Sequence, residues 1–125
     1  MVVFGDVVEH LYFTDLSRAM PFYTGQLGFA LAEQYQRRSE PGVSAACVVR
    51  RGQAIVWLYA AVPELAFPKR ATFYVNDVEG LYEEFIRAGV AIERPPQRAV
   101  VDEYGGEIHR FSLADPEGNP LEFWQ

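Results

Sequence analysis

The segment FSLADPEGNPLEFWQ, residues 111–125, decides the fold that we predict for this chain. Its centre, DPEGN, is typical of a turn, because the proline fixes φ at the second position and the glycine tolerates a positive φ. The residues on either side alternate between apolar and polar, which predicts the two strands of a hairpin. On the second strand, Glu122 and Trp124 share one face. Glu122 either lies in water on an edge strand or faces a site.

A strand, an aspartate and a helix follow one another in the same order twice. Residues 7–13 alternate as a strand does, and Thr14 or Asp15 is placed to cap a helix whose apolar residues recur at helical spacing. Residues 71–75 repeat the strand, and Asp77 repeats the cap. Glycines suited to end the two helices stand at Gly28 and Gly89.

The remaining strands complete two modules with the same order of elements. They are predicted at residues 29–36, 43–49, 54–60, 90–93 (followed by a break at Pro95-Pro96) and 109–113, with 121–124 closing the chain. The stretch 61–68 has no clear period and indicates a linker between module 6–60 and module 69–125. The sequence therefore predicts one α+β domain over residues 1–125. In it, two tandem βαβββ modules form curved mixed sheets with a concave cavity.

Composition and charge exclude several classes of function. The chain has 125 residues and a formal net charge of −6. Nucleic-acid binding is disfavoured, because it needs clusters of lysine and arginine. The single cysteine, Cys47, cannot form an internal disulfide and is expected as a buried small side chain. We recognise no signal peptide or membrane-spanning apolar run, and we expect a cytoplasmic protein that binds no membrane.

Two motifs give the chain a resemblance to a known family. Residues 8–29, with DLSR, FY and LGF in order, resemble the opening of the vicinal oxygen chelate superfamily. That family includes glyoxalase I, bleomycin-resistance proteins and extradiol dioxygenases. The YGG at 104–106, followed by DPEGN and LEF, resembles its C-terminal signature. The likeness spans nearly the whole chain and implies the fold predicted above. It implies less about activity, because one fold hosts many chemistries.

The resemblance also suggests where a metal ion would lie. Metal-using relatives carry four ligands on the first and last strands of the two modules. Register from the capping aspartates and from Gly52 and Gly118 assigns these positions to Val8, Val56, Arg70 and Glu122. Only Glu122 is a competent ligand, because valine has no donor atom and arginine has no lone pair. One carboxylate does not hold a divalent cation, so we expect no metal and no cofactor. Arg70 would either neutralise Glu122 or contact a ligand.

The same strand faces would supply a binding surface. The residues predicted to line it are His10, Tyr12, Val56, Leu58, Arg70, Thr72, Tyr74, Glu122 and Trp124, with Val8 beside them. Aromatic side chains with a few polar groups are typical of a small-molecule pocket, and these rings are suited to stack on a flat ring or on a cation. Trp57 is predicted in the core, and Tyr35 and Phe67 at a rim or a subunit contact.

We predict metal-independent binding and sequestration of a small aromatic or cationic molecule. The resemblance is closest to bleomycin-type antibiotic resistance proteins, in which a dimer encloses the drug between subunits, so we also expect a homodimer. The acidic balance and Glu122 favour cationic or neutral ligands modestly. One alternative is a glyoxalase-like or dioxygenase-like lyase or oxidoreductase with a relocated metal site at His10 and Glu122. Another is a structural or regulatory domain whose own side chains fill the cavity.

Overall fold

The computed structural model describes residues 1–36, 41–101 and 105–125. The first module contains β1 (Val7–Phe13), α1 (Leu16–Pro21), a π-helical turn η1 (Phe22–Gln26), β2 (Ala30–Tyr35), β3 (Val43–Arg51) and β4 (Ala54–Ala61). The second contains β5 (Ala71–Tyr74), α2 (Val78–Arg87), β6 (Arg94–Val101), β7 (Glu107–Ala114) and β8 (Pro120–Trp124). Tyr104 of the YGG motif lies outside the described residues.

Within these ranges, each module forms a four-stranded mixed sheet, and the strand order is the same in both. The order is β1-β4-β3-β2 in the first module and β5-β8-β7-β6 in the second. In each sheet the first and last strands of the module pair in parallel, and all other neighbours are antiparallel. The predicted α+β fold of two tandem βαβββ modules is confirmed.

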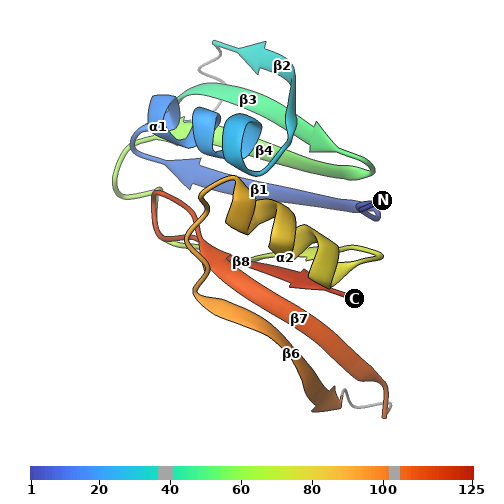
Figure 1. The fold of residues 1–125 in the computed structure, drawn as a ribbon. Coiled ribbons are helices and arrows are strands. Elements are labelled where there is room, and N and C mark those ends of the chain that lie inside the picture. Colours follow the sequence, from blue (N-terminus) through green and yellow to red (C-terminus); the bar gives the residue numbers. More distant parts are fainter. Residues whose placement is uncertain (37–40, 102–104) are drawn as a thin grey trace.

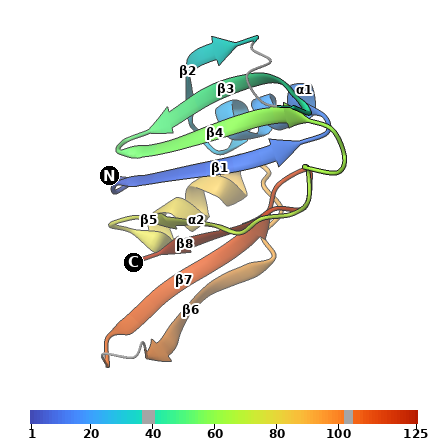
Figure 2. The ribbon, with the colours of Figure 1, turned by 180° about the vertical axis from the view of Figure 1, so that it is seen from behind.

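The two sheets adjoin along β1 and β5. Phe4 forms an isolated antiparallel bridge with Val75, and the Glu9 carboxylate accepts a 3.1 Å hydrogen bond from the Thr72 amide. The strands therefore follow one another in space as one twisted layer (Figure 1). Both helices lie on one side of this layer, and Figure 2 shows the opposite side, where the strands face the viewer. The face of the strand layer opposite the helices is therefore not covered by either helix and can carry a binding site.

Each helix begins at an aspartate: Asp15, one of the two caps predicted for the first helix, and Asp77, the cap predicted for the second. The carboxylates of Asp15 and Asp77 accept hydrogen bonds of 3.2 and 2.9 Å from the backbone amides three residues further on. Gly28 and Gly89, which follow the helical segments, have φ values of +76° and +80°. Glycine adopts this left-handed conformation without strain, so the predicted helix ends are correct.

The first helix differs from the single α-helix that its spacing predicts. Pro21, which has no amide hydrogen to donate, is the last residue of α1. The chain continues as η1, in which the Leu27 amide donates to the Phe22 carbonyl at 3.0 Å, five residues back. Tyr23 lies within this wider turn and is fully buried.

The strand predicted at residues 90–93 is wrong. That stretch has no strand structure, and β6 begins only at Arg94 and continues through the Pro95-Pro96 pair that predicts a break. β6 is the outermost strand of its sheet, and its register with β7 shifts between Arg94 and Gln97. Proline is tolerated at such an edge, because a missing amide hydrogen there need not leave a neighbouring strand unpaired.

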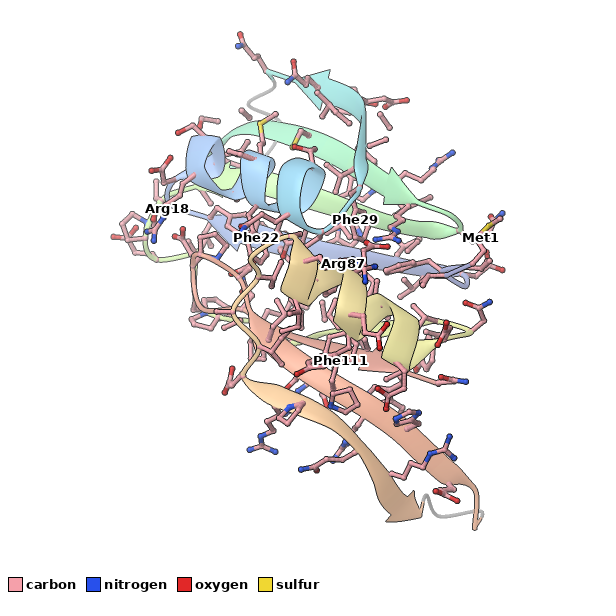
Figure 3. The ribbon with its side chains drawn as sticks, viewed as in Figure 1. Met1, Arg18, Phe22, Phe29, Arg87 and Phe111 are labelled. Carbon is pink, nitrogen blue, oxygen red and sulfur yellow. The ribbon has the colours of Figure 1, made fainter. Side chains whose placement is uncertain are left out.

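One apolar core lies between the helices and the strand layer and joins the two modules. The rings of Phe4 and Phe29 meet edge to face at 5.6 Å, and those of Phe29 and Phe73 at 5.9 Å. Phe123 stacks on Phe73 at 5.3 Å and on Phe111 at 5.0 Å. Figure 3 labels Phe29 and Phe111, which lie beneath the helices of different modules. Because this ring cluster crosses the module boundary, the two halves share one core.

The DPEGN turn directs its first side chain into the protein. Asp115 is buried and accepts hydrogen bonds from the amides of Glu117 and Asn119 at 3.0 and 2.9 Å and from the Tyr23 hydroxyl at 2.7 Å. Burial, together with the neighbouring carboxylate, raises the pKa of Tyr23 well above its ordinary value of 10.0. Asn119 is fully buried and accepts a 2.8 Å bond from the Lys69 amide. The predicted turn is confirmed, and it ties the second module to the first.

Two expectations from composition concern Cys47 and membranes. Cys47 is buried as expected, and burial raises the pKa of its thiol. A raised pKa leaves less thiolate, which agrees with a packing role rather than a nucleophilic one. No helix in the described part of the chain is long and apolar enough to cross a membrane.

Candidate ligand-binding face

We call the side of the strand layer opposite the helices the open face. Side chains alternate along each strand between this face and the core, as in β1, where Leu11 and Phe13 are fully buried. The central strands present Val8, His10 and Tyr12 of β1, Ile55, Trp57 and Tyr59 of β4, Thr72 and Tyr74 of β5, and Glu122 and Trp124 of β8. The residues predicted for β1, β5 and β8 therefore lie together on one face.

β4 presents the side chains opposite to those that the sequence predicts. Val56 and Leu58 were expected to face a ligand, but both are fully buried in the core. Trp57, expected in the core, lies on the open face with Ile55 and Tyr59. The candidate site therefore loses two aliphatic side chains and gains two aromatic ones.

The error comes from treating Gly52 and Gly118 as equivalent. Both lie two residues before a strand, but Gly52 belongs to a two-residue loop and Gly118 to a five-residue turn. The first residue of β4, Ala54, is buried in the core, whereas the first residue of β8, Pro120, lies on the opposite face from its buried neighbour. A register difference of one residue moves every side chain of a strand to the other face.

Five rings stand side by side across the first sheet. This aromatic row consists of Tyr35, Trp57, Tyr59, His10 and Tyr12. Tyr35 stacks on Trp57 at 5.8 Å, Trp57 lies 6.1 Å from both His10 and Tyr59, and Tyr59 lies 4.8 Å from Tyr12. All these ring pairs are within 17° of parallel. A hydrogen bond of 2.8 Å joins His10 Nδ1 to the Tyr59 hydroxyl. The row forms an aromatic platform of nearly parallel rings.

An apolar hollow opens at the Tyr12 end of the aromatic row. It has a volume of about 530 Å³ and is lined by Tyr12, Leu65, Phe67 and Lys69. Leu65 and Phe67 come from the segment predicted as a linker, and the Phe67 side chain is 65% exposed. Lys69 reaches β1, where its Nζ donates to the His10 carbonyl at 3.2 Å. A volume of a few hundred Å³ with mainly apolar walls is the usual size and character of a small-molecule site.

The second sheet carries a charged group on the open face. The Glu122 carboxylate lies 3.1 Å from Arg70 Nε and 3.7 Å from Arg110 Nη1, and its side chain is only 13% exposed. Of the two roles open to Arg70, the structure thus shows the pairing with Glu122. Arg110 also lies over the Trp124 ring, 5.7 Å from its centre. Two guanidinium groups therefore compensate the one carboxylate.

Trp124 contributes a ring and an unused donor beside this group. It meets the half-exposed Tyr74 edge to face at 6.2 Å. Its buried Nε1 has no hydrogen-bond partner within the part of the chain that the structure describes. A nearby cavity of about 40 Å³, lined among others by Arg94, Arg110 and Glu122, has room for a water molecule but not for a ring. The second sheet is therefore a less suitable place for a whole ligand than the hollow.

The donor set does not fit the metal site of metal-using relatives. The structurally related positions are Val8, Trp57, Arg70 and Glu122. Trp57 takes the place assigned to Val56, because His10 pairs with Trp57 as Thr72 pairs with Glu122. Tryptophan, like valine, has no atom that can serve as a ligand for a divalent cation. The one carboxylate, that of Glu122, is already paired with Arg70.

The relocated metal site at His10 and Glu122 also finds no support in the geometry. His10 is held in the aromatic row, with Nδ1 bonded to Tyr59 and its ring stacked on Trp57. Across the described ranges, no three histidine, cysteine, aspartate or glutamate side chains come together in a way that could hold a metal ion.

Comparison with known proteins gives the same fold. A family model described as the Glyoxalase/Bleomycin resistance protein/Dioxygenase superfamily matches residues 5–123. No curated protein matches the sequence. A solved glyoxalase/bleomycin resistance protein from Streptomyces sp. CB03234 is similar with a TM-score of 0.72 at 19% identity, over 97% of this chain and 100% of that one.

Two further solved structures agree. TioX from Micromonospora sp. ML1 has a TM-score of 0.70 at 22% identity, over 97% of this chain and 98% of its own. A glyoxalase/bleomycin resistance protein/dioxygenase from Alicyclobacillus acidocaldarius has a TM-score of 0.65 at 22% identity, over 96% and 89% of the two chains. At such identities the likeness concerns the fold alone.

Proposed function

Given that the chain belongs to the Glyoxalase/Bleomycin resistance protein/Dioxygenase superfamily, we propose that it binds a small, flat aromatic molecule without using a metal ion. The observation that carries this proposal is the aromatic row that ends in the apolar hollow. Tyr12 belongs to both, because it stacks on Tyr59 at 4.8 Å and lines the hollow. A flat ring bound in the hollow would extend the row by one member.

Binding in the hollow has a clear physical basis. Leu65 and Phe67 would cover the ligand with apolar surface, which contributes roughly 25 cal/mol for each Å² removed from water. The neighbouring rings already lie nearly parallel, so little side-chain entropy is lost when another ring stacks on them. Holding a ligand this way without changing it would make the chain a sequestering protein, as the resemblance to antibiotic resistance proteins suggests.

The charges narrow the ligand class expected from the sequence. The acidic balance and Glu122 were the reasons to favour a cationic or neutral ligand, but Arg70 and Arg110 compensate Glu122. The hollow itself carries an ammonium group, that of Lys69, and has no carboxylate among its lining residues. A cation would be repelled there, so the proposal keeps the aromatic half of the prediction and leaves out the cationic half.

We also propose that a second copy of the chain covers part of the open face. Val8 is 54% exposed and Tyr74 is 51% exposed on this face, and Phe67 projects from the segment beside it. These apolar side chains are more favourable against protein than against water. A two-fold dimer is the commonest way to close such a surface.

Fluorescence can test the binding proposal, because Trp57 and Trp124 are the two tryptophans of the chain. In a Trp124→Phe background the remaining indole reports on the aromatic row. We expect 2-naphthamide or 2-naphthoate to quench it, and Tyr12→Ala to weaken binding by roughly tenfold. Ile86→Ala, on the exposed face of α2, is the matched control and should leave binding unchanged.

Two results would overturn the proposal. The first is that neither naphthalene compound binds, or that Tyr12→Ala binds as well as the control variant. The second is a stoichiometric zinc, iron, manganese or nickel ion in protein purified without chelators, if that metal is lost in Glu122→Gln. The second result would favour the metal-dependent enzyme over the binding protein.

A further inference from the structure

We propose that the ligand of the hollow carries an anionic group, such as a carboxylate, and that Lys69 binds this group. The inference rests on the proposed function, because it takes the hollow as the ligand site. It adds the chemical class of the ligand: a flat aromatic acid, with its ring among Tyr12, Leu65 and Phe67 and its acid group at the ammonium.

The backbone of Lys69 is fixed by the fold, and its ammonium group reaches the edge of the hollow. The Lys69 amide donates a 2.8 Å hydrogen bond to Asn119 Oδ1. Asn119 is fully buried and is itself held by Asp115, to which its backbone amide and its side-chain nitrogen donate at 2.9 Å each. From this anchored position the side chain crosses to β1, where Nζ meets the His10 carbonyl. The ammonium is therefore positioned by the fold at the edge of the hollow.

The charge of Lys69 is not compensated by a described carboxylate. The ammonium has three donors, and the hydrogen bond that the structure shows goes to a neutral carbonyl. Carboxylates on the neighbouring elements bond elsewhere: Glu122 to Arg70 and Arg110, and Glu9 to the Thr72 amide.

One further carboxylate comes close to this end of β1. Glu117 accepts hydrogen bonds from the amide and the hydroxyl of Thr14, the residue that follows β1. Glu64, in the segment that supplies Leu65, does not line the hollow. A ligand acid would therefore meet an ammonium with unused donors.

Lys69 places a positive charge at the hollow of an otherwise acidic molecule. The chain has a formal net charge of −6, but the one charged residue among the described residues that line the hollow is Lys69, whose neighbour Arg70 is already paired with Glu122. A neutral ring would leave the ammonium without a counter-charge. An acid gains a charge-assisted hydrogen bond to this ammonium while its ring packs on the apolar walls.

A matched set of probes tests the inference in the Trp124→Phe background. The probes are 2-naphthoate, 2-naphthamide and 2-naphthylmethylammonium, which share one ring system and differ in charge. We expect naphthoate to bind about tenfold more tightly than the amide, since hydrogen bonds to charged groups are the stronger ones. The ammonium compound should bind most weakly, and added salt should weaken naphthoate more than the amide.

Substitutions assign the effect to Lys69. Lys69→Gln should remove the preference for naphthoate over the amide, and Lys69→Arg should keep most of it. Arg87→Gln, which removes the same charge from the exposed end of α2 on the helix side, should change nothing (Figure 3). Thermal unfolding of each variant shows whether it is folded.

The outcomes separate this inference from the proposed function. If acid and amide bind equally and both are lost in Tyr12→Ala, the inference is overturned while the proposed function stands. If Lys69→Gln and Arg87→Gln weaken naphthoate equally, the preference reflects overall charge and the assignment to Lys69 is wrong. If none of the three probes binds, the proposed function falls, and the inference falls with it.

Discussion

The hydroxyl of Tyr23 donates a 2.7 Å hydrogen bond to Asp115 across 92 positions of the sequence, and both side chains are buried. Tyr23 comes from η1 in the first module, and Asp115 opens the DPEGN turn in the second. The same carboxylate is bonded by the turn's own amides at Glu117 and Asn119. The motif that carries much of the family resemblance therefore has a structural role, which is to fasten the two modules to each other.

Replacing Tyr23 by phenylalanine should lower the free energy of unfolding by about 1–2 kcal/mol. The change removes one donor from a buried carboxylate while keeping the ring in the core. Urea denaturation followed by circular dichroism would measure it. Tyr82→Phe is the matched control, because Tyr82 is only partly buried and packs on Phe111 through its ring. Equal losses in the two variants would show that the bond to Asp115 adds no stability.

The raised pKa of Tyr23 predicts that the free energy of unfolding depends on pH above the ordinary tyrosine pKa of 10.0. Folding raises the pKa of Tyr23, so the folded state holds this proton more tightly than the unfolded state does. The stabilisation is complete below the ordinary pKa and is lost as the pH rises towards the raised value. The stability difference between wild type and Tyr23→Phe should therefore shrink from about pH 8 to about pH 11. A constant difference over that range would contradict the shift.

Arg51 links the two modules through a second set of contacts, and replacing it should lower the free energy of unfolding. Its guanidinium donates to both carboxylate oxygens of Glu84 on α2, at 2.6 and 2.8 Å, and to the Leu27 carbonyl at 2.8 Å. Arg51→Ala should cost about 1–2 kcal/mol of unfolding free energy, because the pair is partly exposed. Arg51→Lys should recover only part, since an ammonium cannot reproduce the two-pronged contact. Arg50→Ala, at the exposed neighbour, should change stability by less than about 0.5 kcal/mol.

Light scattering tests the proposed dimer. We expect twice the chain mass at tens of micromolar protein, with an interface of at least about 1,200 Å² in total. Val8→Glu, on the open face, should shift the protein towards monomer, because a buried unpaired charge is costly. Ile86→Glu introduces the same charge on α2 and should leave the mass unchanged. A monomer mass for the wild type, or dissociation only in the Ile86 variant, would refute this arrangement.

Most of the framework could be predicted from local chemistry. Asp15 and Asp77 cap helices because a carboxylate at that position accepts a backbone amide, which depends on neighbours in the sequence alone. Alternation in β1 and β8 likewise placed His10 and Glu122 on one face, because the side-chain period of a strand is two.

The errors arose where non-local pairing decides the structure. The face of Trp57 depends on the register of β4, and the two-residue loop at Gly52 sets a different register from the longer turn at Gly118. The strand expected at 90–93 lies further along the chain, because an outer strand accepts the two prolines of β6. Phe67 was expected at a rim or a subunit contact and lines the hollow, but Leu65 and the hollow itself were not predicted, since both residues lie in a stretch without any period.

That stretch is fixed at both ends and by a turn between them, in which the Leu65 amide donates to the Val62 carbonyl at 2.9 Å. The Val62 amide donates to the Gly42 carbonyl at 2.9 Å, and the Lys69 amide to the Asn119 side chain at 2.8 Å. Between these two hydrogen bonds, Leu65 and Phe67, which line the hollow, belong to no strand or helix. We therefore expect substitutions of Leu65 and Phe67 to change the shape of the hollow while the strand layer and both helices keep their places.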